Sequence, residues 1–148
     1  MKLTLSAAVL LAALLPVAAH ADLPASPGSL HALTDLRAAR RNLEHRPGDA
    51  AVSIKEEAAI TEIDRAIGET LKAVRENEKN PRDHRREDAD LDRPGRLQRA
   101  LELLKKAQGD LAEEAPPEAE EHKQRTLLHI DRAIDAAKHA VRDLEPNR

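Results

Sequence analysis

The sequence contains no cysteine and no phenylalanine, tyrosine or tryptophan, and these absences exclude several classes of protein. Without cysteine there is no disulfide framework, no thiolate nucleophile and no zinc-finger pattern. Without aromatic residues there is no stacking platform for single-stranded nucleic acid and no aromatic cage for a cation. The 24 basic and 27 acidic residues nearly balance, so the charge gives no indication of nucleic acid or a membrane surface as partner.

The first segment has the pattern of a cleavable export signal. Lys2 gives a positive start, an apolar run follows to Ala19, and the small residues Ala19 and Ala21 mark a signal-peptidase site. A membrane anchor is the alternative, but the run is short for a span of about 20 residues and Pro16 interrupts it. We therefore predict a signal peptide over residues 1–21, cleavage after Ala21, and export to the bacterial periplasm without stable membrane insertion.

Breaks in the remaining sequence divide it into two helical units. Residues 22–28 carry two prolines and a glycine, which is typical of a flexible leader. Apolar periodicity predicts a first helical hairpin over residues 29–77 and a second one over residues 96–145. Residues 78–95 are the most polar part of the chain and are interpreted as a charged, solvated linker between the hairpins.

Capping residues and helix breakers predict where the helices begin and end. Ser29 is expected to cap a first helix that ends near His45, just before a Pro-Gly pair. A longer second helix is predicted from about Asp49 to Asn77. Asp92 is expected to cap the third helix. The fourth helix has apolar residues alternately three and four positions apart, which is typical of a coiled coil.

Two stretches of the chain repeat after 67 or 68 residues. The motif Ala-Leu-x-x-Leu-x-x-Ala-x-x-x-Leu begins at Ala32 and again at Ala100, and Ile-Asp-Arg-Ala-Ile begins at Ile63 and again at Ile130. Each unit is thus predicted to be a short helix, a turn and a long helix. Because one hairpin cannot bury its own apolar stripe, we expect the two to pack face to face. The predicted fold is all-α, a four-helix bundle made of two tandem hairpins.

Three segments of the chain also resemble known proteins. The segments His31–Leu43, Ala59–Ile67 and Pro94–Leu104 are similar to uncharacterised small secreted bacterial proteins built from repeated Ala-Leu-x-x-Leu-x-x-Ala helical hairpins. The resemblance covers most of residues 30–144. It implies a helical fold and an exported location, and it implies no catalytic or ligand-binding residue.

The histidines beyond residue 21 are the main candidates for a ligand site. No two of them are three or four positions apart, the spacing at which one helix presents two ligands to a metal ion. His122 and His129 are two turns apart, about 10.5 Å along a helix, which is too far to share an ion. Solvated surface histidines are the first interpretation. The alternative is a metal site assembled between helices, for which His31, Glu62, His122 and His129 are the candidates.

Asp64 and Asp131 occupy equivalent positions of the two repeats, next to the apolar stripe. An aspartate in such a position more often forms an ion pair between helices than it takes part in catalysis. Arg37 and Lys105, which are also equivalent, are the expected partners. Exposed pairs contribute only about 0–1 kcal/mol, so we expect these pairs to set the register of the helices and not the stability.

The sequence contains no motif that indicates catalysis. It has no Gly-rich phosphate loop, no Ser-centred nucleophile elbow and no Glu-x-x-His motif of a di-metal bundle, so we expect no enzyme activity and no cofactor. The first hypothesis for function is a structural or protein-interaction module of the periplasm, with envelope stress as one setting. Its partner would be a second copy or another periplasmic protein, and not nucleic acid. The second hypothesis is a metal- or small-ligand-binding protein that uses surface His, Asp and Glu side chains.

The predicted signal peptide can be tested on the exported protein. Intact mass spectrometry of the chain purified from the periplasm should give the mass of residues 22–148, because signal peptidase cleaves after a small residue at position −1. A mass that still includes residues 1–21 would contradict both the cleavage and the predicted compartment.

Overall fold

The computed structural model describes residues 26–46, 49, 53–74, 90–113 and 120–144, and this part of the chain forms four α-helices. The helices are α1 (Pro27–Leu43), α2 (Ile54–Ala73), α3 (Arg93–Glu113) and α4 (Glu120–Leu144). The described ranges contain no strand. The predicted all-α class is confirmed.

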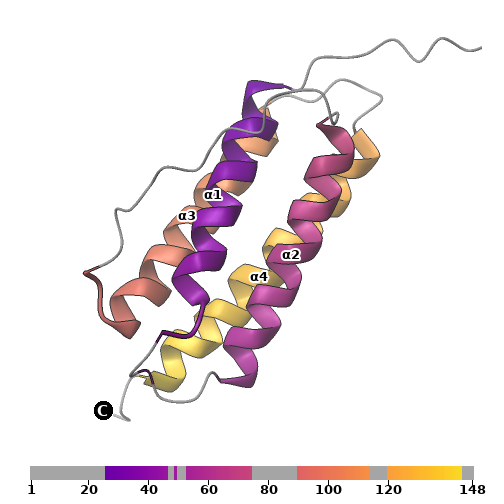
Figure 1. Ribbon diagram of the computed structural model, residues 1–148. Coiled ribbons are helices and arrows are strands. Elements are labelled where there is room, and N and C mark those ends of the chain that lie inside the picture. Colours follow the sequence, from indigo (N-terminus) through magenta and orange to yellow (C-terminus); the bar gives the residue numbers. More distant parts are fainter. Residues whose placement is uncertain (1–25, 47–48, 50–52, 75–89, 114–119, 145–148) are drawn as a thin grey trace, which may run out of the picture.

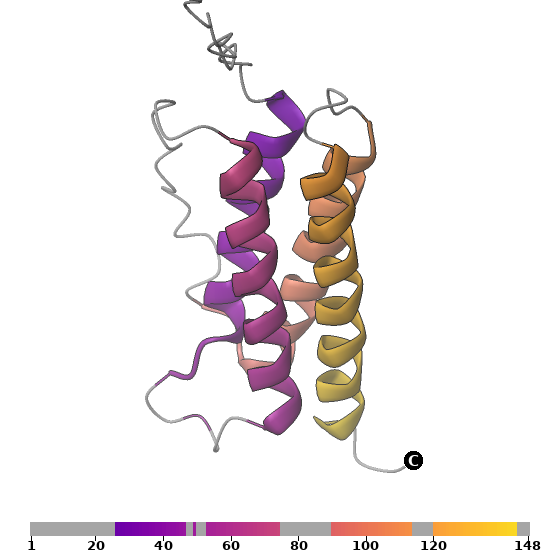
Figure 2. The same cartoon turned by 90° about the vertical axis from the view of Figure 1, so that its right-hand side faces the viewer.

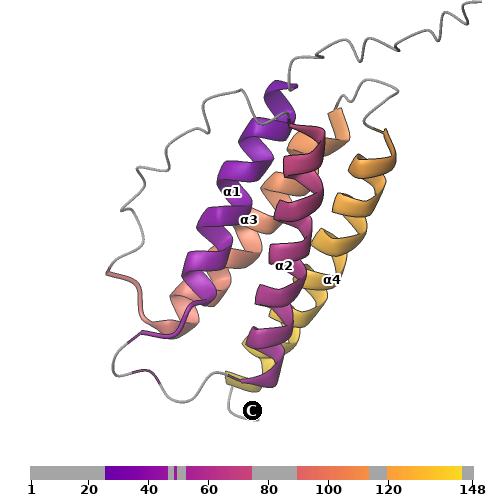
Figure 3. The ribbon, with the colours of Figure 1, turned by 45° about the vertical axis from the view of Figure 1, so that its right-hand side comes forward.

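Each helix packs against two others in a bundle whose neighbouring helices are antiparallel (Figure 1). α1 packs against α2 and α3, and α4 packs against the same two helices, so α1 lies diagonally across from α4. Figure 2 shows α2 and α4 side by side, and Figure 3 shows α3 directly behind α1. The closest packing is thus between the two hairpins, α1 with α3 and α2 with α4. The predicted four-helix bundle of paired hairpins is confirmed.

The first helix begins earlier than the sequence predicts. Its N-cap is Ser26 and not Ser29, because Ser26 Oγ accepts a hydrogen bond from the Ser29 backbone N–H at 3.2 Å. Pro27 occupies the first turn, where its fixed φ suits the helix and no intrahelical N–H bond is required. Ser29 therefore donates a hydrogen bond to the N-cap residue Ser26 and is not the N-cap itself.

The second helix begins later than predicted and is stabilised by a capping box. Ser53 Oγ accepts from the Glu56 backbone N–H at 3.2 Å, and Glu56 Oε2 accepts from the Ser53 backbone N–H at 2.7 Å. Asp49, the predicted start, lies in the connection from α1, where its carboxylate accepts from the Arg46 backbone N–H at 2.9 Å. The sequence signal for the true start is the Ser-x-x-Glu motif.

The third helix starts where the sequence predicts. Asp92 Oδ1 accepts from the Gly95 backbone N–H at 2.9 Å, so Asp92 caps α3 as expected. The helix therefore begins inside the range 78–95 that was expected to be a linker, and α1 likewise includes the last two residues of the predicted leader. The predicted signal peptide, residues 1–21, and most of the leader and linker lie outside the described residues.

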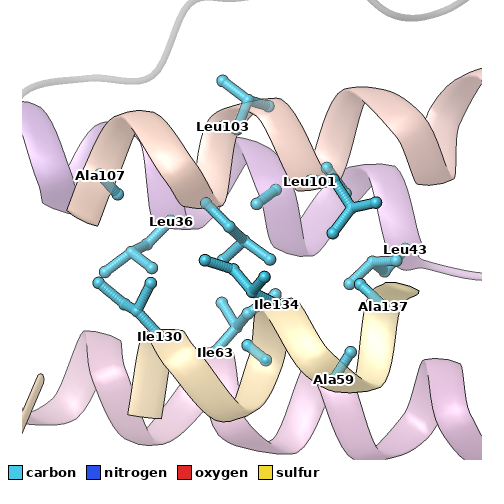
Figure 4. Close-up of a cluster of buried hydrophobic side chains, with 14 of the residues drawn as sticks. Leu36, Leu43, Ala59, Ile63, Leu101, Leu103, Ala107, Ile130, Ile134 and Ala137 are labelled. Carbon is cyan, nitrogen blue, oxygen red and sulfur yellow. The ribbon is translucent and has the colours of Figure 1, made fainter. Parts of the chain in front are cut away.

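The core lies where the apolar stripes of the four helices meet (Figure 4). Leu36, Ile63, Leu104 and Ile130, one from each helix, are fully buried there, and such burial contributes about 1.5–3 kcal/mol for each side chain. Figure 4 shows Leu36, Ile63 and Ile130 pointing into the space between the helices. Fully buried alanines let the helix backbones approach closely; they are Ala32, Ala39, Ala59, Ala66, Ala100, Ala107, Ala133 and Ala137.

The surface of the described helices carries only single large apolar side chains. Ile54 and Leu71 lie toward opposite ends of α2, and Leu128 lies on α4. Apolar side chains that are exposed singly are normal on protein surfaces. None of the described helices combines the length and the apolarity that a membrane span needs.

Two glycines of the bundle differ in the space around them. A Cβ atom on Gly28 would collide with the backbone carbonyl of Asp110 on α3, whereas a Cβ atom on Gly68 meets nothing within 4 Å. Gly28→Ala should therefore lower the free energy of unfolding by about 1–3 kcal/mol, because the start of α1 must move away from α3. Gly68→Ala should raise it by about 0.5–1 kcal/mol, because alanine is the better helix former. Urea unfolding followed by circular dichroism measures both changes, and shifts of the same sign would contradict this packing.

Candidate functional site

A cluster of ionisable side chains lies where α2 packs against α4. Glu62 Oε2 lies 2.7 Å from His129 Nδ1, and Glu69 Oε2 lies 3.0 Å from His122 Nδ1. We call these four residues the α2–α4 seam. Because a carboxylate only accepts hydrogen bonds, each imidazole donates its Nδ1–H. The seam thus joins the two helices by two Glu–His hydrogen bonds.

Helical geometry places the two pairs of the seam in register. Seven residues make about two turns, so Glu62 and Glu69 lie on one face of α2, and His122 and His129 lie on one face of α4. Because the two helices run antiparallel (Figure 2), Glu69 meets His122 while Glu62 meets His129. The side chains of His129 and Glu62 are 18% and 15% exposed, so this pair is largely shielded from solvent.

Cationic side chains surround the two glutamates of the seam. Arg65 Nη1 donates to Glu62 Oε1 at 2.5 Å, and Lys72 Nζ donates to Glu69 Oε1 at 2.6 Å. Arg125 of α4 adds an ion pair to Glu69, with its Nε 3.3 Å from Oε2. Each carboxylate is therefore held both by a cation of its own helix and by the facing helix.

These contacts keep both glutamates ionised. The pKa of Glu69 is lowered from its usual 4.5 to about 2, chiefly by the hydrogen bond from Lys72 and next by the hydrogen bond from His122. For Glu62 the largest single effect is burial, which raises the pKa, but the hydrogen bond from His129 and the charge of Arg65 together lower it overall. Carboxylates of lowered pKa are weak bases and are not proton donors near pH 7. The seam is thus suited to holding helices together.

The residues predicted for a metal site do not form one cluster. The structure brings Glu62 and His129 together, but it pairs His122 with Glu69, two turns away. His31 lies exposed on α1, whereas the Glu62 carboxylate faces α4. Within the part of the chain that the structure describes, no three His, Asp or Glu side chains are grouped so that they could hold a metal ion.

The interhelical partners of Asp64 and Asp131 differ from those predicted. Arg40 Nε donates to Asp64 Oδ1 at 2.6 Å, and Gln108 Nε2 donates to Asp131 Oδ1 at 2.5 Å. The predicted partners lie three residues earlier on the same helices; they are Arg37 and Lys105. The prediction is therefore wrong by nearly one turn. Apolar periodicity determines which face of a helix is buried, but not how far the helix is shifted along its neighbour.

Two ion pairs that the sequence analysis misses lie at the end of the bundle where α2 and α3 begin. Arg93 donates to Glu56 through Nε at 3.0 Å and through Nη2 at 2.5 Å. Arg96, whose side chain is 6% exposed, forms an ion pair with Asp49. Burial raises the pKa of Glu56, but hydrogen bonds from Arg93 and from Ser53 lower it overall. The Ser-x-x-Glu motif could have located Glu56, but no local pattern points to an arginine 37 positions away.

A further ion pair between the hairpins involves a buried carboxylate of α1. Lys106 Nζ of α3 donates to Asp35 Oδ2 at 2.5 Å and to Asp110 Oδ2 at 2.9 Å. These two hydrogen bonds raise the pKa of Lys106. The Asp35 side chain is only 1% exposed. Replacement of Lys106 would therefore leave a buried carboxylate without its cation, which would strongly lower the stability of the fold.

Comparisons with known proteins do not assign this arrangement to a family. No protein-family model matches the chain. No curated protein matches it, and neither does any solved structure.

The lowered pKa of Glu69 makes its contribution to stability depend on pH. Above pH 4.5 the carboxylate is charged in both states and its native contacts stabilise the fold, and this stabilisation is lost as the pH falls toward 2. Glu69→Gln should therefore lower the melting temperature at pH 7, and its difference from the wild type should shrink steadily between pH 4.5 and pH 2. Thermal unfolding followed by circular dichroism measures this difference.

The control for this experiment is Glu57→Gln, which changes an exposed glutamate of the same helix. It should alter the melting temperature much less than Glu69→Gln. Equal effects of the two changes, or a Glu69→Gln difference that stays constant down to pH 2, would contradict the role assigned to the seam.

Proposed function

We propose that the protein is an exported, non-enzymatic helical bundle that works as a structural or protein-interaction module in the periplasm. One observation supports this proposal. The ionisable side chains that the fold brings together from distant parts of the sequence form contacts between helices. The α2–α4 seam, the Glu56–Arg93 pair and the Lys106–Asp35 pair each join one hairpin to the other. Charged contacts of this kind set helix register and partner choice.

The charged state of the two glutamates of the seam favours recognition over catalysis. General acid–base catalysis at neutral pH is most efficient with a group whose pKa lies near 7. The pKa of Glu69 is about 2, and the pKa of Glu62 is also lowered. Carboxylates that stay charged and accept several hydrogen bonds support a role in aligning helices.

The proposal includes the predicted repeat of one hairpin unit. The contact between Arg40 and Asp64 in the first hairpin corresponds in sequence position to the contact between Gln108 and Asp131 in the second. The Glu62–His129 pair of the α2–α4 seam joins residues that are 67 positions apart, which is also the distance between the repeated residues Ile63 and Ile130. Both observations support two equivalent hairpins related by an approximate twofold axis between α2 and α4.

Photo-crosslinking in the exporting cell tests the proposed function. A crosslinking residue is placed, one position at a time, at exposed sites of the four helices, namely His31, Leu71, Glu102 and Leu128. We expect discrete adducts of higher mass in the periplasmic fraction, gathered at the positions of one face, because a specific interface covers only part of a surface. A chain that lacks residues 2–21 and stays in the cytoplasm is the control and should lose these adducts. Absence of adducts at all four positions in the exported chain would contradict the proposal.

Metal binding is a second candidate function, and the contact between Glu62 and His129 favours it. A carboxylate that accepts from Nδ1 of a histidine fixes the ring and leaves Nε2 available to a metal ion, as in many metal sites. His122 and Glu69 repeat this arrangement two turns away. Each pair would need further ligands from outside the described residues or from a partner.

A zinc titration separates the two candidate functions. Metal binding would raise the melting temperature with increasing Zn²⁺. His122→Ala combined with His129→Ala would abolish the rise, while His139→Ala, which lies outside the seam on the same helix, would not. The interaction module predicts no dose-dependent rise. Differential scanning fluorimetry of the wild type and the two variants measures these shifts.

A further inference from the structure

One side of the layer formed by α2 and α4 is left uncovered by α1 and α3, which lie behind this layer in Figure 2. Glu121, at the start of α4, is an exposed carboxylate on this side and pairs with Arg125 at 2.9 Å. Four cationic side chains, two from each helix, lie next to the α2–α4 seam on the same side; they are Arg65, Lys72, Arg125 and Arg132. We call these four residues the cationic face.

The cationic face is positive at its surface, although the chain as a whole has a net charge of −3. The side chains of Arg65, Lys72 and Arg125 are 55%, 60% and 46% exposed. The glutamates that they contact, Glu62 and Glu69, are only 15% and 13% exposed. A partner that approaches the α2–α4 seam therefore meets the cations before the carboxylates.

The contacts within the bundle use only part of the hydrogen-bonding capacity of these cations. Lys72 donates one hydrogen bond to Glu69, and a lysine ammonium group carries three N–H donors. Arg65 donates through Nη1 to Glu62, and a guanidinium group carries five N–H donors. Each cation is therefore held in place by its glutamate and can still donate to the carboxylate of a partner.

The spacing of the cationic face matches that of another helix. Arg65 and Lys72 are seven residues apart on α2, and Arg125 and Arg132 are seven residues apart on α4, so each pair is about 10.5 Å apart along its helix. Acidic residues seven positions apart on a partner helix have the same spacing and lie on one face. In an extended strand, 10.5 Å corresponds to about three residues, and residues three apart point to opposite faces. The spacing thus favours a helix as the partner.

Two exposed apolar side chains lie on the same side of the layer. Leu128, which is 48% exposed, lies one turn from both Arg125 and Arg132. Ile54, which is 86% exposed, lies five turns before Lys72 on the same stripe of α2. A helix that lies in a membrane interface carries a whole apolar face, and two separate side chains do not form one. These side chains fit the few apolar residues of an amphipathic helix.

We propose that the cationic face is a docking surface for an acidic amphipathic helix of another protein. This proposal rests on the proposed function as an interaction module and states the chemistry of its partner. The partner helix lies along the groove above the α2–α4 seam, with acidic residues seven positions apart against the four cations. Its apolar residues contact Leu128 and Ile54.

A synthetic peptide tests this docking surface. The probe has about 20 residues, enough to form a helix in water, with glutamates seven residues apart in two rows and leucines between the rows. The control peptide has the same composition, but its glutamates are spread around the whole helix. Fluorescence anisotropy measures the affinity of the exported chain for each peptide at about 0.05 M salt, where exposed charges are screened little. We expect binding of the probe and at least about fivefold weaker binding of the control peptide, because only the probe aligns its glutamates with all four cations. Equal affinity for both peptides, or no binding of the probe, would overturn the proposal.

Paired substitutions locate the surface on the chain. Lys72→Gln combined with Arg132→Gln should weaken binding of the probe about fivefold, since each lost cation contributes as an exposed ion pair does. Lys105→Gln combined with Lys138→Gln removes the same charge from exposed positions outside the cationic face and should leave the affinity unchanged. Circular dichroism verifies that both variants keep their helices, and the comparison of the two peptides on the wild type does not depend on either variant. Equal losses of affinity in the two variants would overturn the proposal.

Two further outcomes separate this proposal from its alternatives. Binding of the chain to vesicles of an anionic phospholipid, together with no binding of the probe, would assign the cationic face to a membrane surface and overturn the proposal. In the crosslinking experiment described above, the docking surface predicts adducts at Leu128. Adducts at His31 and Glu102 without any at Leu128 would overturn the docking surface and leave the interaction module in place.

Discussion

Each hairpin buries its apolar stripe against the other hairpin, and the rest of the structure depends on this mutual burial. Leu36 and Ile63 of the first hairpin and Leu104 and Ile130 of the second are fully buried at the centre. The chain has no aromatic residue with which a single hairpin could build a larger core of its own. Short helices gain most of their stability from tertiary packing, so a hairpin without its partner would lose most of what holds its helices. The four helices are therefore expected to fold as one unit.

Polar contacts select one alignment among those that the apolar stripes allow. Leucine, isoleucine and alanine recur at alternating spacings of three and four residues, so helices shifted by two turns could still bury apolar side chains. Such a shift would separate Glu56 from Arg93 and leave a buried carboxylate without its cation, which costs far more than an exposed ion pair contributes. The α2–α4 seam likewise favours one alignment of α2 against α4, because a shift by two turns would break one of its two Glu–His pairs. The charged residues thus define the register, while the aliphatic residues supply the burial.

Local spacing predicts the helices and their buried faces, but it does not predict which side chains meet. Asp92 is recognisable as a helix cap because the cap and the N–H that it accepts are three residues apart. The partner of Asp64 is Arg40 and not the residue predicted one turn earlier, because the stagger of two helices depends on side chains of both. Glu62 and His129 are both recognisable as candidate ligands, but their contact joins positions 67 residues apart and has no local signature. The fold could therefore be predicted from the sequence, whereas the pairing within the candidate site could not.

Native-state hydrogen exchange tests the mutual dependence of the hairpins most directly. If each hairpin relies on the other for its core, the most protected amides of α1, α2, α3 and α4 should exchange with the same free energy of opening, equal to that of global unfolding. Their exchange should also respond together to low concentrations of denaturant. Protection that persists in α3 and α4 while α1 and α2 exchange freely, or the reverse, would contradict the account, because it would show that one hairpin keeps its fold without the other.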